Sequence, residues 1–310
     1  MTDPQNGKGR GYLALGVTSI VWGTTWIASK FAVHEMPALQ MAAIRQLIAG
    51  LCFVLFFLIY KKAGFPSARQ FRWLFVMAVL MFVFANGLST WSLQYIPTGL
   101  SALIGALYPL SVVIIEKIFY KTAKLTALTF IGLFLGITGV GIVFYENAFN
   151  HYGPAFLTGI TLSAIAMLSW SFGTVFLSRN KTNMNPYYGT GWQMLIGSMM
   201  LFILSEATQP TVPVASISGK AWLLIGYLVL FGSVLSFIAF IYSMRKLSPA
   251  VASLYAYINP LVAMLLGAVL LDEKITGYIL WGAIVTLAGV FLVNYSIRKQ
   301  RKNIIAEPEQ

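Results

Sequence analysis

The chain has 310 residues, of which 58% are hydrophobic and only 10% are charged, and it carries a net charge of +12. Soluble globular domains carry about 25% charged residues, so the composition excludes an ordinary soluble protein and predicts a multi-pass membrane protein. The basic residues lie in short loops rather than on one face, which argues against a nucleic-acid partner. Cys52 is the single cysteine, so neither an intramolecular disulfide nor a cysteine metal site is expected.

Ten apolar segments follow one another along the chain, each of a length that crosses a bilayer as a helix of about 20 residues. We interpret the first as a retained helix, because its apolar run is too long for a typical signal peptide. Short polar or basic breaks separate the segments. The predicted spans are 12–33, 38–60, 71–92, 97–119, 125–145, 155–177, 187–207, 220–243, 249–271 and 276–296.

The basic residues indicate how these spans are oriented. When the loops are assigned alternately to two sides, 17 of the 21 Lys and Arg residues fall on the side of the N-terminus. Three fall on the other side, and Arg45 lies inside a span. By the positive-inside rule, both termini are predicted to be cytoplasmic, in the cytoplasmic (inner) membrane of a bacterium.

The two halves of the chain resemble each other. Residues 86–145 match a stretch that begins about 150 residues later. Each half holds five spans, an odd number, so the second half must be inverted relative to the first, as in many carriers. We therefore predict an all-α membrane protein with two inverted five-helix repeats, 1–148 and 149–298, and a cytoplasmic tail, 299–310. The matching positions are Pro97 with Pro249, Ser101 with Ser253, Pro109 with Pro260, Gly132 with Gly282 and Gly139 with Gly289.

Short motifs stand at three places in this framework. They are W-G-x-x-W-x-x-x-K at residues 22–30, R-x-x-x-A from Arg45, and the acidic-basic pair Glu273-Lys274 near the end of the second repeat. Together with the spacing, the duplication and the topology, they make the chain resemble the drug/metabolite transporter superfamily, specifically the ten-helix EamA-type carriers. One departure is Phe119-Tyr120-Lys121, which stands where a Gly-Glu-Arg-like turn is common in that family.

The resemblance implies a secondary transporter rather than an enzyme. The expected activity is movement, more often export than import, of a small metabolite such as an amino acid or a drug-like compound. It also implies that the first, third, fourth, sixth, eighth and ninth helices enclose a central substrate cavity, which excludes the second helix. Alternating access of two inverted bundles about that cavity is the expected mechanism.

Polar and aromatic side chains recur at helical spacing on those six helices, in three symmetric pairs. In lipid, such side chains tend to face protein or a water-filled cavity, although close packing of helices also explains small hydroxyl residues. An aromatic-lined cavity of this kind suits a small, partly apolar, neutral or zwitterionic solute. The predicted cavity residues are Trp22, Thr25, Asn86, Trp91, Tyr108, Trp170, Thr174, Ser236, Tyr257 and Asn259.

Two prolines and one arginine stand out inside the spans. Pro109 and Pro260 occupy matching places and are predicted hinges, because proline removes a backbone donor and bends a helix. Arg45 is expected to make a structural contact, to backbone carbonyls or to Glu35, rather than to bind substrate. Gly132 begins a G-x-x-x-G pattern that serves either the two repeats of one chain or a dimer, so monomer and homodimer both stay open.

The residues near the span centres include no Asp, Glu or His. This pattern argues against a dedicated proton relay, which makes a proton-coupled multidrug antiporter the alternative function. A membrane-embedded enzyme is a remote alternative, because it needs acids or histidine clusters within the spans. No cofactor and no metal are expected, and the predicted partners are a small-molecule substrate and the lipid bilayer.

Overall fold

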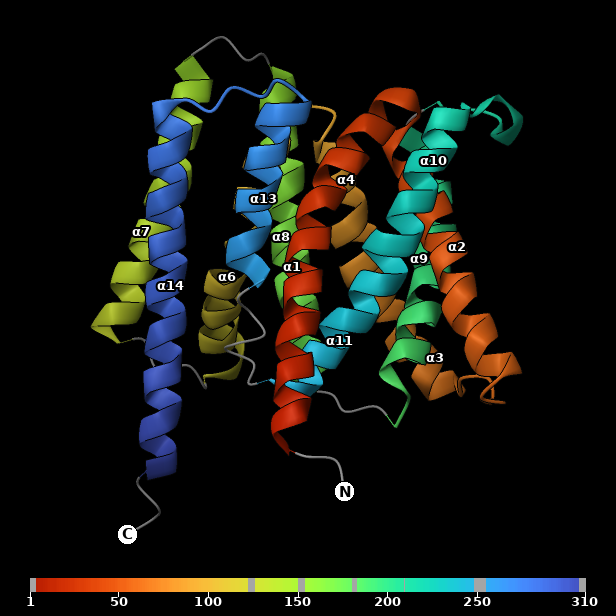
Figure 1. Ribbon diagram of the computed structural model, residues 1–310, viewed down its shortest axis with the longest axis horizontal. Coiled ribbons are helices and arrows are strands. Elements are labelled where there is room, and N and C mark those ends of the chain that lie inside the picture. Colours follow the sequence, from red (N-terminus) through yellow and green to blue (C-terminus); the bar gives the residue numbers. More distant parts are fainter. Residues whose placement is uncertain are drawn as a thin grey trace.

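The computed structural model describes residues 4–121, 126–149, 154–179, 183–208, 210–247 and 255–306. In these ranges the helices form ten rods that run alternately up and down in one bundle (Figure 1). Seven rods are single helices: α1 (Pro4–Glu35), α2 (Ala38–Ile59), α7 (Ala127–Phe149), α8 (Pro154–Arg179), α9 (Pro186–Thr208), α13 (Tyr255–Leu270) and α14 (Gly277–Ala306). The predicted all-α, ten-helix architecture is therefore confirmed.

The other three rods are composite. The third contains α3 (Ala68–Ala78), the π-helical stretch η1 (Val79–Gly87) and α4 (Leu88–Ser92). The fourth contains α5 (Thr98–Gly105), α6 (Tyr108–Ile115) and a second π-helical stretch, η2 (Glu116–Tyr120). The eighth contains α10 (Gly219–Tyr227), η4 (Leu228–Leu235, also π-helical) and α11 (Ser236–Lys246), and the short 3₁₀ turn η3 (Val214–Ser216) precedes it.

Within the described ranges, six rods are long and apolar enough to cross a membrane by length and composition, and two shorter apolar helices accompany them. The first and last predicted spans differ from the helices in length, because α1 begins at Pro4 and α14 continues to Ala306. The predicted ninth span begins outside the described residues, which resume at Tyr255.

The polarity of the bundle is the reverse of that of a soluble protein. Large apolar side chains are exposed on its outside, for example Phe130, Phe134 and Trp281. Hydroxyl side chains are buried inside, and Thr18, Ser101 and Ser233 have no exposed surface. A bilayer solvates the outer apolar surface, so the polar groups collect where protein supplies hydrogen-bond partners.

The same local features recur in both halves, about 150 residues apart. Ser67 and Ser218 cap the third rod of each half, with their hydroxyls accepting from the backbone N–H of Gln70 and Ala221. The π-helical stretches η1 and η4 lie in the middle of the same two rods. Lys121 and Asp272 end the fourth and ninth rods with a left-handed backbone (φ 53° and 54°). The backbone conformation thus repeats between the two halves, as the sequence does.

Helices of opposite halves pack against each other throughout the bundle. α2 packs on α9 and α7 packs on α14, so two symmetric pairs flank the centre. Between them, α1 contacts α11 and α13, while its counterpart α8 contacts the third and fourth rods. Because α1 and α8 run in opposite directions (Figure 1), the two halves are related as an inverted repeat.

Glycines bring α7 and α14 into close contact. A Cβ atom added to Gly132 would lie 2.7 Å from the carbonyl oxygen of Gly289, and one added to Gly139 would lie 2.6 Å from that of Gly282. Absent side chains thus let two backbones approach. In the sequence repeat Gly132 matches Gly282 and Gly139 matches Gly289. In the structure Gly132 instead contacts Gly289 and Gly139 contacts Gly282, as expected for two matching helices that pack in opposite directions. The G-x-x-x-G surface therefore joins the two repeats of one chain.

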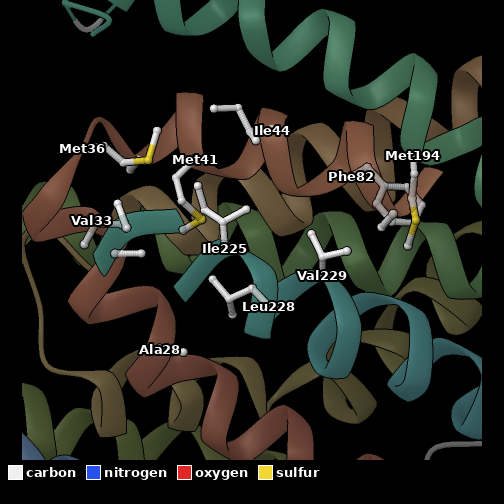
Figure 2. Packing of buried hydrophobic residues seen from close by; sticks show 14 of the residues in the cluster. Ala28, Val33, Met36, Met41, Ile44, Phe82, Met194, Ile225, Leu228 and Val229 are labelled. Carbon is white, nitrogen blue, oxygen red and sulfur yellow. The ribbon is translucent and has the colours of Figure 1, made fainter. Parts of the chain in front are cut away.

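The largest apolar cluster lies where α1, α2 and the eighth rod meet. Figure 2 shows Met41 and Ile44 of α2 facing Ile225, Leu228 and Val229 of the eighth rod. These contacts fix α2 against η4, and Arg45 follows Ile44 directly in the chain. The packing thereby holds Arg45 beside η4 and close to the centre of the bundle.

Candidate functional site

A cavity of about 170 Å³ lies between the two halves. Its walls come from α1, from the third, fourth and eighth rods, and from α8 and α13, which are the six helices that the family resemblance implies. One residue of a seventh helix, Arg45 of α2, also lines it. Two of the three π-helical stretches in the described residues border this region: η1 supplies Asn86, and Phe237 lies two residues after the end of η4. Such stretches often occur at functional sites.

Six of the ten predicted cavity residues lie in this lining: Trp22, Thr25, Asn86, Tyr108, Trp170 and Asn259. The predicted hinge Pro260 also lines the cavity, from the interior of α13. The predicted hinge Pro109 lies in the first turn of α6, directly after the break between α5 and α6. The structure gives the positions of these residues, and their roles in substrate contact and hinge motion stay predictions.

The structure places the other four predicted residues elsewhere. The hydroxyls of Thr174 and Ser236 donate to backbone carbonyls of their own rods, at 3.0 and 2.7 Å. Tyr257 faces α14 and donates to the carbonyl of Val290 at 3.0 Å. Trp91 packs into apolar clusters with its indole nitrogen buried, because it follows the lining residue Thr90 and one residue turns a helix by about 100°.

Aromatic rings form one wall of the cavity. The rings of Trp22 and Trp170, predicted as a symmetric pair, stand edge to face with centroids 6.2 Å apart. Tyr255 packs edge-on against Trp22 at 5.3 Å and stacks on Tyr108 at 5.8 Å. The indole N–H of Trp22 donates to the carbonyl of Gly232 at 3.1 Å. Rings held by so many neighbours form a fixed apolar surface on which a flat solute can pack.

The polar wall contains hydroxyls and amides. Ser101 bridges Ser92 and Ser163 through contacts of 3.0 Å on both sides. The indole N–H of Trp26 donates to Oδ1 of Asn259 at 2.9 Å. Because an indole N–H is only a donor, that contact fixes which end of the amide faces Trp26. Trp26 lies four residues after Trp22, on the same face of α1, so helical spacing counted from Trp22 could have identified it from the sequence.

Arg45 differs from its expected role in two ways. Its Nε donates to Oγ of Ser233 at 2.9 Å, so its partner is a hydroxyl of η4 rather than a carbonyl or Glu35. Glu35 instead pairs with Lys220 at 2.8 Å, and this hydrogen bond from Lys220 lowers the pKa of Glu35. Arg45 also lines the cavity, although the family resemblance leaves helix 2 out. The cause is its long side chain, which reaches past its own helix to η4.

Side-chain contacts close the bundle at the end opposite the termini. Lys30 donates to the backbone carbonyls of Leu93 and Ile96, where the third rod ends. Glu273, between α13 and α14, accepts from the backbone N–H and the hydroxyl of Thr98, both at 2.8 Å. Pro97, the N-cap residue of α5, supplies no side-chain cap of its own, so Glu273 satisfies this helix N-terminus from another part of the chain. We call the contacts of Glu273 with Thr98 the Glu273 cap.

A different contact joins helices at the end nearer the termini. Arg179, the last residue of α8, pairs with Glu116 at 3.4 Å and lies 3.9 Å above the ring of Tyr120. Both partners belong to η2, at the end of the fourth rod. The two ends of the bundle therefore use different chemistry, a carboxylate on a helix N-terminus at one and a surface ion pair at the other.

Comparison with known proteins agrees with this architecture. Residues 9–145 and 157–295 each match the EamA-like transporter family. The chain is 31% identical to the uncharacterized inner membrane transporter YedA of Escherichia coli, covering 90% of this chain and 91% of YedA. It is 25% identical to the uncharacterized transporter YoaV of Bacillus subtilis (93% and 98%) and 27% identical to the protein PecM of Dickeya dadantii (92% of each).

A solved crystal structure shares the fold. It superposes with a TM-score of 0.65 over 94% of this chain and 99% of that one, at 18% sequence identity. The family match covers both halves and leaves out only short segments at the ends and at the junction between them. The ten helical rods, the inverted halves and the two family matches lead to one conclusion: this chain is a membrane transporter of the EamA-like transporter family.

Proposed function

We propose that this protein exports a small organic metabolite across the cytoplasmic membrane of a bacterium by alternating access. The observation that carries the proposal is the cavity between inverted halves, which has an aromatic wall, a polar wall and a closed end. The name of YedA, an inner membrane transporter, supports the location. The excess of basic residues on the side of the termini supports cytoplasmic termini.

The size of the cavity favours a small metabolite over a drug-like compound. Pockets for drug-sized ligands have volumes of about 300–1,000 Å³, whereas this one holds about 170 Å³. A solute with one ring or an amino-acid-sized body matches that volume. We therefore place an amino acid or a similar small amphipathic molecule ahead of larger compounds.

The mechanism follows from which helices touch. α1 packs with α11 and α13, and α8 packs with the third and fourth rods, so each group mixes helices of both halves. Rocking of these two groups about the cavity would open one end while the other closes. In the present conformation the Glu273 cap and the Lys30 contacts hold the end opposite the termini together.

Transport by inverted membrane vesicles tests the proposal. Uptake of labelled amino acids into such vesicles corresponds to export from the cell, and right-side-out vesicles give the opposite direction. We expect Trp22→Ala to lower the transport rate about tenfold or more, because truncating a buried aromatic contact costs about 2 kcal/mol or more. Trp281→Ala is the matched control, since this tryptophan is 64% exposed on the outer face of α14.

Two results would contradict the proposal. Equal loss of transport in both tryptophan variants would mean that the cavity has no special role. Accumulation only in right-side-out vesicles would show import and would reverse the proposed direction while leaving the cavity assignment in place.

A further inference from the structure

We infer that Arg45 makes the cavity a site for an organic anion, specifically a small aromatic or apolar molecule with one carboxylate. This inference rests on the proposed function and names its class of substrate. The neutral or zwitterionic solute expected from the sequence matches a cavity lined by uncharged side chains only, with Arg45 in a structural contact outside it. In the structure Arg45 lies in the wall of the cavity.

The first step is the burial of the Arg45 charge. The residue is only 5% exposed, and its side chain has one hydrogen bond, from Nε to Ser233. An arginine carries five N–H donors in a planar fork, so the outer nitrogens of this one have no hydrogen-bonding partner among the described residues. An unpaired buried charge is costly, and a carboxylate is the group that offsets the cost with paired hydrogen bonds.

The second step is the charge of the cavity as a whole. Among the described residues that line it, Arg45 is the single ionisable side chain that carries a charge at neutral pH. The Asp and Glu side chains of the described chain lie elsewhere, with Glu35 on Lys220 and Glu116 on Arg179. A solute with one negative charge would bring the cavity to neutrality. A dianion such as a phosphate monoester would leave an excess charge.

The third step is the supply of further donors. Asn259 uses its Oδ1 to accept from Trp26, which leaves its NH₂ group to donate. Asn86 likewise uses Oδ1 to accept from Gln46, at 2.8 Å. Both asparagines line the cavity. With both Oδ1 atoms occupied, these two amides have their NH₂ groups left to donate, which favours a carboxylate over an ammonium group.

The fourth step is the space that η4 leaves for the guanidinium group. A Cβ atom added to Gly232 would lie 3.2 Å from Nη2 of Arg45 and 2.7 Å from the side chain of Thr25. The missing side chain at Gly232 lets the arginine reach from α2 to the cavity wall. The carbonyl of the same residue accepts from Trp22, so one short segment positions both the charge and the aromatic surface.

Three probes of matched shape test the inference: phenylacetate, its neutral amide phenylacetamide, and the cationic phenethylamine. Binding to purified protein is measured by tryptophan fluorescence and by thermal stabilisation, which follows ligand affinity for the folded state. We expect wild-type protein to bind phenylacetate at least about tenfold more tightly than the amide, because a charged hydrogen-bonded pair contributes about 1.4 kcal/mol or more. Phenethylamine should bind most weakly.

Variants assign that preference to the arginine. Arg45→Met should bind phenylacetate and phenylacetamide equally, through loss of affinity for the acid. Arg45→Lys keeps the charge and should keep part of the preference. Ser233→Ala removes the partner of Nε while the charge stays, so it should keep the preference as well. If Arg45→Met does not fold, the ratio of acid to amide in wild-type protein still decides the inference.

The outcomes separate this inference from the proposed function. Equal binding of acid and amide to wild-type protein, or a preference that survives in Arg45→Met, overturns the inference and leaves transport of a neutral solute standing. Saturable transport of amino acids without any binding of the three probes also overturns it. Tighter binding of phenylacetate than of phenylacetamide to wild-type protein, with equal binding of the two in Arg45→Met, supports the inference. Failure of every probe together with failure of vesicle transport removes the proposed function as well.

Discussion

Removal of the Glu273 carboxylate should open the end of the bundle opposite the termini. In Glu273→Ala the backbone N–H and the hydroxyl of Thr98 lose their acceptor, as does the backbone N–H of Gly99, whose contact is longer at 3.4 Å. Nothing within α5 replaces them, because its N-cap residue is a proline without a capping side chain. The closed arrangement would then depend on Lys30 and on apolar packing alone.

The magnitude follows from the two short hydrogen bonds. A hydrogen bond to a charged group contributes about 1.5–3 kcal/mol when buried, and Glu273 is half-buried. We take about 2 kcal/mol for the pair after allowance for solvent. That energy corresponds to about a 30-fold change in the ratio of open to closed molecules. Glu273→Gln keeps one acceptor oxygen and should give an intermediate value.

Cysteine labelling measures this ratio. Cys52 is the only cysteine and is exposed, so Cys52→Ser gives a cysteine-free background for a reporter at Ala102, which lines the cavity and is 3% exposed. A membrane-impermeant thiol reagent is applied from the side opposite the termini. We expect Glu273→Ala to raise the labelling rate about 30-fold. Lys274→Ala, at the exposed neighbouring position, is the control and should leave the rate unchanged.

One result would refute the reasoning about the cap. If the reporter reacts at the wild-type rate in Glu273→Ala while the melting temperature is preserved, Glu273 does not hold this end closed. If the melting temperature falls sharply and labelling rises from both sides of the membrane, the carboxylate stabilises α5 itself rather than one conformation of the bundle.

Two further predictions concern the helix contacts and the hinge. Gly139→Ala should lower the melting temperature, because overpacking costs about 1–3 kcal/mol, whereas Gly141→Ala, with open space around its Cβ, should not; equal melting temperatures would contradict the glycine contact between α7 and α14. Pro260→Ala should lower the maximal transport rate more than it changes the half-saturating concentration, since it restores a backbone bond in the interior of α13. Pro109→Ala should change the rate less, because a first-turn proline interrupts no helical hydrogen bond; the reverse order would exchange the two hinge assignments.

The architecture could be predicted from the sequence because its signals are local. Apolar runs mark the helices, and the repeat of Pro, Ser and Gly residues marks the duplication. Of the spans that are single helices, α2, α7, α8 and α9 needed only small changes at their ends, whereas α1 and α14 are longer than predicted and the start of the ninth span lies outside the described residues. Pro109, which the sequence marks as a place where the helix bends, lies directly after the break between α5 and α6. The π-helical stretches η1 and η4 were not predicted, because they depend on tertiary packing that leaves no simple pattern in the side chains.

The cavity was predictable only in part, for a geometric reason. A stripe at steps of three and four residues selects one face of a helix, and Trp22, Thr25 and Asn86 were found in that way. The rotation of each helix against its neighbours decides which face is inward, and a turn of one residue separates Trp91 from Thr90. Arg45 could not be placed by any stripe, because its length carries the charge to a neighbouring helix.

The contact between Arg45 and Ser233 spans 188 positions in the sequence, and this has a consequence for biogenesis. Domains and their segments emerge from the ribosome N-terminal part first, so α2 enters the membrane long before η4 is synthesised. A central arginine costs about 2.5–3.5 kcal/mol on insertion scales, and its partner does not yet exist. The first half of the chain must therefore wait in the membrane with its charge near the insertion machinery or the headgroups. Assembly is completed only when the eighth rod is inserted. A truncation that removes this rod would therefore leave Arg45, near the beginning of the chain, without its partner Ser233.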